Sequence, residues 1–172
     1  MSGVLGFPSP VNEKAARTVA GGVLLLGIAT VVLSVTVDTF WLWLTVPLAY
    51  GFLARVLTGP KLSPLGQLAT RVIAPRLGEA KPTAGPPKRF AQGMGFAFTA
   101  SAAVLHFALA WDRAAIVLLI GLIGAATLES VLGFCIGCRI FGLLMKAGVI
   151  PESVCAECAD IWIRVKEPTA AA

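Results

Sequence analysis

The stretch Thr18–Val37 (TVAGGVLLLGIATVVLSVTV) decides the fold class, because its 20 residues carry no charge. At a rise of ~1.5 Å per residue, an α-helix of this length crosses the ~30 Å hydrocarbon core of a bilayer. The run is also longer than the apolar core of a secretory signal peptide, and no small-residue cleavage site follows it. We therefore expect it to stay in the protein as a transmembrane helix.

The composition of the whole chain supports this interpretation. Of the 172 residues, 57% are hydrophobic and 13% are charged, and the mean hydropathy is +0.85. A soluble domain has about 25% charged residues. The formal net charge is +5, but the basic residues fall between apolar segments and no nucleic-acid-binding motif is present. The composition indicates an integral membrane protein whose principal partner is the lipid bilayer, with no nucleic-acid partner.

Further apolar segments predict a single all-α membrane domain over residues 1–172. Four transmembrane helices are expected, at about residues 18–37, 39–55, 91–111 and 114–134. A loop at 56–90 separates the second helix from the third, and a Cys-rich tail follows at 135–172.

The positive-inside rule orients these helices. All but Arg113 of the 14 Lys and Arg residues fall in the N-terminal tail, the central loop or the C-terminal tail. Both termini, the central loop and the Cys-rich tail are therefore expected in the cytoplasm.

Short elements are expected outside the spans. Ser63 as N-cap and Pro64 as first residue predict an amphipathic helix on the cytoplasmic membrane surface, ending before Pro75. Residues 81–87 (KPTAGPP) have the composition of an extended linker. A short helical extension completes the chain, with segments at 139–147 and from 151 to about 165.

Several motifs together give this chain a family resemblance. They are SPLGQLATRVIAPRLG at 63–78, PPKRFAQGMG at 86–95 and ESVLGFCIGCRIFGLL at 129–144. The chain resembles the DUF4395 family of bacterial membrane proteins, whose function is unknown, from about Val11 to Leu144. The resemblance implies four membrane helices in the bacterial inner (plasma) membrane. Its G-F-C-x-G-C element, Gly133 to Cys138 here, is similar to membrane segments attached to some rhodaneses, which implies sulfur or thiol handling.

All four cysteines occur in two C-x-x-C pairs, Cys135/Cys138 and Cys155/Cys158. A reducing cytoplasm argues against structural disulfides and leaves thiol redox chemistry, metal binding or simple packing. The spacing between the pairs fits a zinc site, so the four thiolates are also candidate ligands of zinc or an iron–sulfur cluster. Both pairs continue helical patterns, however, whereas zinc ligands usually sit on tight turns.

The position of each thiol relative to a helix end bears on its reactivity. Cys155 follows the predicted helix start at Pro151, where the helix dipole favours a thiolate. Cys138 is expected at the C-terminal end of the fourth span, where the dipole opposes one, unless Gly137 breaks that helix. The sequence leaves Cys155 and Cys138 as alternative nucleophiles.

Two polar residues lie within predicted spans. Glu129 carries the one charge of the fourth span's interior, and a carboxylate costs about 2.5–3.5 kcal/mol there, so it is expected to face the bundle. One interpretation gives Glu129 a role in proton relay or substrate contact. The other is that Glu129 is protonated or hydrogen-bonded to a Ser or Thr and has no such role. His106 is the only histidine, and a single histidine does not support a bis-histidine haem without dimerisation. The two residues are expected about 15 Å apart in height, beyond direct contact.

Thiol–disulfide or sulfur handling at the cytoplasmic face is the function these residues favour. A thioredoxin- or rhodanese-like cytosolic protein would be the partner in such exchange. One alternative is a non-enzymatic accessory or scaffold subunit of a larger membrane complex, with a structural four-cysteine metal site. A small transporter of sulfur compounds is the other, and it would have to be an oligomer because four spans are few.

Overall fold

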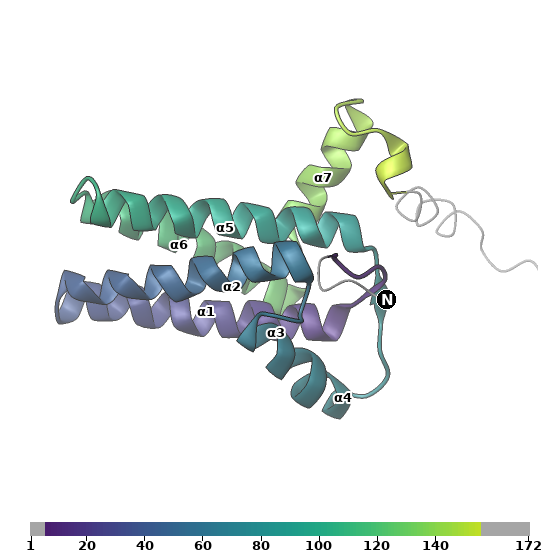
Figure 1. Cartoon of the computed structure of the whole chain (residues 1–172), viewed down its shortest axis with the longest axis horizontal. Coiled ribbons are helices and arrows are strands. Elements are labelled where there is room, and N and C mark those ends of the chain that lie inside the picture. Colours follow the sequence, from purple (N-terminus) through teal and green to yellow (C-terminus); the bar gives the residue numbers. More distant parts are fainter. Residues whose placement is uncertain (1–5, 156–172) are drawn as a thin grey trace, which may run out of the picture.

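Long antiparallel helices form a bundle in the computed structural model, which describes residues 6–155 (Figure 1). In chain order they are α1 (Glu13–Thr36), a 3-10 turn η1 (Thr39–Leu44) that continues into α2 (Thr45–Thr58), α5 (Gly85–Phe107) and α6 (Asp112–Leu132). Helix α1 packs against α6, and α5 packs against both α2 and α6. The predicted all-α class is confirmed for this part of the chain, apart from two-residue strands that pair at Val11–Asn12 and Pro82–Thr83.

Three of these segments are long and apolar enough to cross a membrane: α1, η1 with α2, and α6. The fourth predicted span corresponds to α5, which begins at Gly85 rather than at residue 91 and ends at Phe107 rather than at 111. The predicted linker at 81–87 is therefore wrong in its last residues. Gly85, Pro86 and Pro87 form the first turn of α5, where proline is well tolerated because no N–H is needed.

The predicted surface helix is present between α2 and α5. Ser63 caps α3 (Pro64–Leu68), and its hydroxyl accepts a hydrogen bond from Gly66 N at 3.2 Å. The helix does not stop before Pro75, because a π-helical turn η2 (Ala69–Ile73) carries it into α4 (Ala74–Arg76). The segment lies across one end of the bundle beside α1 (Figure 1).

The end of α6 differs from the prediction. Gly133 adopts a left-handed conformation (φ 67°) that ends α6, and α7 (Ile136–Lys146) starts two residues after Phe134 and points away from the bundle (Figure 1). A 3-10 turn η3 (Glu152–Cys155) follows, and the rest of the helix predicted from 151 to 165 lies outside the described residues.

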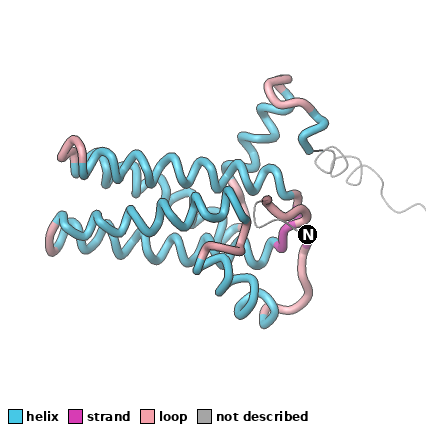
Figure 2. Tube along the Cα trace, in the orientation of Figure 1, coloured by secondary structure: helices cyan, strands magenta, loops and turns pink. Residues whose placement is uncertain are grey.

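The two ends of the bundle differ in structure and charge. One end has the short turns that join α1 to η1 and α5 to α6, and the other gathers the N-terminal segment, α3, α4, the loop before α5 and the start of α7 (Figure 2). Among the described residues, every Lys and Arg except Arg113 lies at this second end or on α7, which begins there.

The closest helix packing depends on Gly95 of α5. A Cβ at this position would lie 2.2 Å from the ring of Phe52 on α2. Phe52 is itself buried in the core, and the Arg55 guanidinium carbon lies 4.6 Å from the centre of its ring, so displacing the ring disturbs this contact. Small residues allow membrane helices to approach closely in this way.

Gly95→Ala should therefore destabilise the bundle by about 1–3 kcal/mol, the usual cost of overpacking a core. Thermal unfolding in mild detergent measures the effect. Gly93→Ala, on the same helix, is the matched control because a Cβ there meets nothing within 4 Å. Equal unfolding temperatures for the two variants would contradict this account of the packing.

Candidate functional site

A free dithiol, Cys135 and Cys138, lies where α7 begins. Cys135 is the N-cap residue of α7, and its Sγ accepts a hydrogen bond from Cys138 N at 3.4 Å. The Cys138 thiol also donates to Cys135 Sγ, with the sulfur atoms 2.7 Å apart. The pair is therefore arranged so that a disulfide can form between its two sulfur atoms with little movement of the chain.

The helix break at Gly133 creates this arrangement. The expectation that the pair continues the fourth span, with its dipole opposing a thiolate on Cys138, is wrong. Because α6 ends at Leu132, Cys135 instead stands at the N-terminus of a new helix, where backbone N–H groups and the helix dipole favour negative charge.

Gly137, between the two thiols, allows α7 to pack against α5. A Cβ on Gly137 would lie 2.6 Å from Ala91 Cβ and 2.7 Å from Ala91 Cα. The sequence left open whether Gly137 breaks a helix. It does not, because Gly137 lies within α7. The glycine of the C-x-G-C element thus holds the dithiol directly against the first turns of α5.

The two thiols differ in acidity. The hydrogen bond that the Cys138 thiol donates is the largest influence on Cys135 and lowers the pKa of Cys135. The same bond, together with burial, raises the pKa of Cys138. Cys135 therefore ionises first, which is the asymmetry that a nucleophilic and a resolving thiol require.

A buried ion pair lies beside the dithiol. Lys88 Nζ of α5 is 2.6 Å from Glu129 Oε1 of α6, and the two side chains are 8% and 15% exposed. The charge of Lys88 favours ionisation of both thiols, and the charge of Glu129 opposes it. Glu129 faces the bundle as expected, but its partner is a lysine and not a Ser or Thr.

Sequence reasoning missed Lys88 because it assigned residues 56–90 to a loop. The available signal was periodicity: Lys88, Gln92, Gly95, Thr99 and Ala102 recur at helical spacing, and together they form the inward side of α5. Starting the helix at the Gly85–Pro86–Pro87 element would have placed Lys88 inside the bundle. Arg55, also counted with the loop's basic residues, is likewise buried, within α2.

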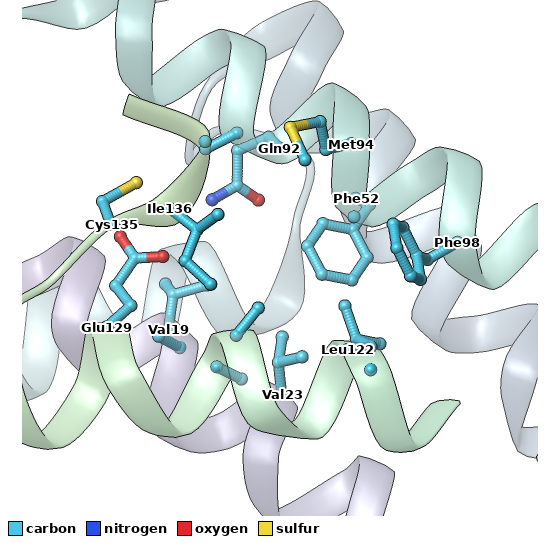
Figure 3. A pocket seen from close by; sticks show the side chains of 17 residues that line it. Val19, Val23, Phe52, Gln92, Met94, Phe98, Leu122, Glu129, Cys135 and Ile136 are labelled. Atoms are coloured by element: carbon cyan, nitrogen blue, oxygen red, sulfur yellow. The ribbon is translucent and has the colours of Figure 1, made fainter. Parts of the chain in front are cut away.

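A cavity of about 190 Å³ extends from Cys135 into the bundle (Figure 3). Cys135, Glu129 and Gln92 line one end, and Phe52, Phe98 and Leu122 line the other. It spans Gly121 to Glu129 on α6, which is about 12 Å of helix.

The polar end of this cavity is tied to Arg55. Arg55 Nε donates to Gln92 Oε1 at 2.6 Å, and its Nη1 donates to Ser63 Oγ at 2.9 Å. The guanidinium carbon lies 4.6 Å from the centre of the Phe52 ring. These contacts fix the orientation of Gln92 and connect the cavity wall to the capped start of α3.

His106 takes no part in this site. Its Nδ1 lies 2.6 Å from Asp112 Oδ1, where α5 ends and α6 begins, which is the end of the bundle opposite to Glu129. Asp112 is the first residue of α6 and Glu129 lies near its end, so about 25 Å of helix separates them. The predicted separation of about 15 Å is therefore too small, and direct proton transfer between His106 and Glu129 is excluded by the larger distance.

The second C-x-x-C pair is only partly described. Cys155 is buried in a small cluster with Ala84 and Phe141, and Cys158 lies outside the described residues. Within residues 6–155, no group of three or more His, Cys, Asp or Glu side chains is placed to hold a metal ion. The zinc or iron–sulfur site formed by all four cysteines stays a prediction.

Comparison with known proteins identifies the family. A family model described as a domain of unknown function, DUF4395, matches residues 11–146, and the chain belongs to this family. The match includes Cys135 and Cys138 and ends before Cys155. No curated protein and no solved structure matches the chain.

The electrostatics of the site predict how pH controls alkylation of Cys135. Its thiolate should form, and react with iodoacetamide, at a pH below the ordinary cysteine range. Lys88→Met should move the midpoint of reaction to higher pH because a favourable charge is lost, and Glu129→Gln should move it to lower pH.

Peptide mass spectrometry after timed alkylation assigns the reaction to Cys135 or Cys138. Arg89→Met is the matched control, because Arg89 follows Lys88 but is exposed and donates to Val56 O. Shifts of the same sign in the Lys88 and Glu129 variants would contradict this electrostatic assignment.

Proposed function

We propose that this protein is a four-span bacterial plasma-membrane protein with both termini in the cytoplasm, and that it performs thiol–disulfide exchange at the cytoplasmic face. Membership of the DUF4395 family and three apolar spans support a membrane location. The single observation that carries the exchange activity is the placement of Cys135 at the N-cap of α7, with Cys138 one turn later.

Helix α5 is the fourth span in this proposal. Its 23 residues extend about 35 Å, enough to cross the bilayer core. It packs between α2 and α6, and the basic residues near its start pair internally or lie at the basic end of the bundle. The gathering of Lys and Arg at that end favours its location in the cytoplasm.

Single cysteines introduced into a variant with all native cysteines changed to Ser test this topology. With a membrane-impermeant maleimide, Asp38→Cys and Leu109→Cys should label in intact cells, and Glu79→Cys should label only after permeabilisation. All three positions are exposed. If α5 does not span, Leu109→Cys will behave like Glu79→Cys, and the four-span topology is wrong.

Cys135 is the attacking nucleophile in the proposed reaction. Its thiolate attacks one sulfur of a disulfide on a cytosolic partner, forming a mixed disulfide and releasing the partner's other sulfur as a thiolate. Cys138 then attacks Cys135 Sγ, which forms the Cys135–Cys138 disulfide and releases the second partner thiol. The partner gains two electrons and the protein's dithiol loses two.

Glu129 acts in the second step of this reaction, the attack of Cys138 on Cys135 Sγ. Cys138 must lose its proton before it attacks, and burial and the hydrogen bond to Cys135 keep that proton on the sulfur. We assign Glu129 the role of accepting it, because its carboxylate lies at the same end of the cavity as Cys135, the hydrogen-bond partner of Cys138 (Figure 3). A partner thioredoxin- or rhodanese-like protein would then leave in its reduced form.

Cys138→Ser should trap the mixed disulfide with a protein partner, and Cys135→Ser should trap none. Both are made with Cys155 and Cys158 changed to Ser, so that only this pair reports. Non-reducing gels and mass spectrometry measure trapped complexes.

Equilibration of the protein with defined ratios of reduced and oxidised glutathione gives an independent measurement. Reversible loss of two free thiols per chain, at Cys135 and Cys138, is the expected result. A dithiol that stays reduced at every ratio, or equal trapping by Cys135→Ser and Cys138→Ser, would show that the exchange activity is not a property of this pair.

A further inference from the structure

We propose that the cavity beside the dithiol binds the ring of a lipid-soluble quinone, which accepts the two electrons of Cys135 and Cys138. This inference rests on the proposed thiol chemistry and names a second substrate of the same site. Thiol–disulfide exchange is reversible, so after the quinone has oxidised the pair, a partner protein with a reduced dithiol attacks the Cys135–Cys138 disulfide, is itself oxidised to a disulfide and restores the two thiols. Three features of the cavity carry it: its size, the arrangement of its aromatic and polar walls, and its position between membrane helices.

The volume suits one small ring system. An apolar cavity of about 150 Å³ binds benzene, so a cavity of about 190 Å³ accommodates a single six-membered ring with small substituents. Flavins and haems are too large for it. A benzoquinone ring carrying a flexible isoprenoid or alkyl tail fits, provided that the tail leaves the cavity.

The lining matches a flat ring with polar edges. Phe52 and Phe98 present aromatic side chains at the inner end, where Val23 and Leu122 complete an apolar wall (Figure 3). Gln92 lies toward the dithiol end, and its oxygen already accepts from Arg55. Its amide nitrogen is left to donate to a quinone carbonyl.

The cavity also reaches the side of the bundle. Gly121 lines it and is exposed on α6, in the middle of a helix that is apolar enough to span the membrane. A Cβ at Gly121 would lie 3.3 Å from the Phe98 ring, so glycine keeps this side of the cavity open. A molecule dissolved in the bilayer can therefore enter laterally, whereas a charged, water-soluble acceptor would have to cross an apolar wall.

The reaction balances without a further reagent. Two thiols and one quinone become one disulfide and one hydroquinone: an S–S bond forms, two S–H bonds are lost and two O–H bonds are made. The electron pair passes from the sulfur atoms to the ring. Of the two protons, that of Cys138 passes through Glu129, and the other comes from Cys135 through the solvent at the end of the bundle.

The test uses the full chain with Cys155 and Cys158 changed to Ser, reduced, freed of reductant and kept anaerobic in mild detergent. Decylubiquinone, a benzoquinone with a short alkyl tail, is the probe. We expect one hydroquinone to form for each dithiol lost, and quinone added to the oxidised protein to raise its unfolding temperature.

Ala125→Leu should slow quinone reduction by about tenfold or more, because Ala125 lines the cavity and the larger side chain occupies it. Gly124→Leu is the matched control, since Gly124 is exposed on α6, does not line the cavity, and a Cβ there would meet nothing within 4 Å. Ala125→Val serves as a smaller change if Ala125→Leu unfolds. Oxidation by glutathione disulfide should proceed at the wild-type rate in all three variants.

Each outcome separates the two proposals. A wild-type dithiol that glutathione disulfide oxidises but decylubiquinone does not would overturn the quinone inference and leave thiol exchange standing. Equal quinone rates in the Ala125 and Gly124 variants would also overturn it, because the reaction would then occur outside the cavity. A dithiol that neither reagent oxidises would overturn the proposed function itself.

Discussion

A lysine and a glutamate that pair inside an apolar bundle must lie at the same depth in the two helices that carry them. Lys88 on α5 and Glu129 on α6 meet this requirement, with 2.6 Å between their charged atoms and little exposure of either side chain. Removing one partner of such a pair leaves an uncompensated buried charge, at a cost of about 3–5 kcal/mol. The ion pair therefore sets the register of α5 against α6, and with it the positions of the cavity walls.

The dithiol depends on this register. Gly137 touches Ala91, one turn after Lys88, so the first turn of α7 can rest on α5 only where α5 presents its small residues. Gly133 ends α6 just after Glu129 and turns the chain toward that surface. Two glycines and one ion pair together place Cys135 at a helix N-terminus, where backbone N–H groups, the helix dipole and the hydrogen bond from Cys138 favour a thiolate.

The cavity and the dithiol form one chemical unit. Arg55 holds Gln92 on one wall, Glu129 of the ion pair lines the end next to Cys135, and aromatic residues line the inner end. A site of this kind can be reached from two sides. A protein partner can approach the thiols from the basic end of the bundle, and a small apolar molecule can approach the cavity from the lipid. This geometry is the basis on which we propose that electrons pass from a reduced protein partner, by exchange in the reverse direction, through the Cys135/Cys138 pair to the quinone.

The sequence alone determined the membrane class, the positions of the three apolar spans, the capped start of α3 at Ser63 and the family, because these follow from local composition, short motifs or a long match. The sequence also identified the cysteines as candidate site residues. Only the tertiary structure decided that Lys88 pairs with Glu129 and that the helix breaks at Gly133, which makes Cys135 the N-cap thiol. Lys88 and Glu129 are 41 positions apart. Their pairing depends on how two helices pack, and the free-energy penalty for leaving a charge unpaired in an apolar interior acts only once that packing exists.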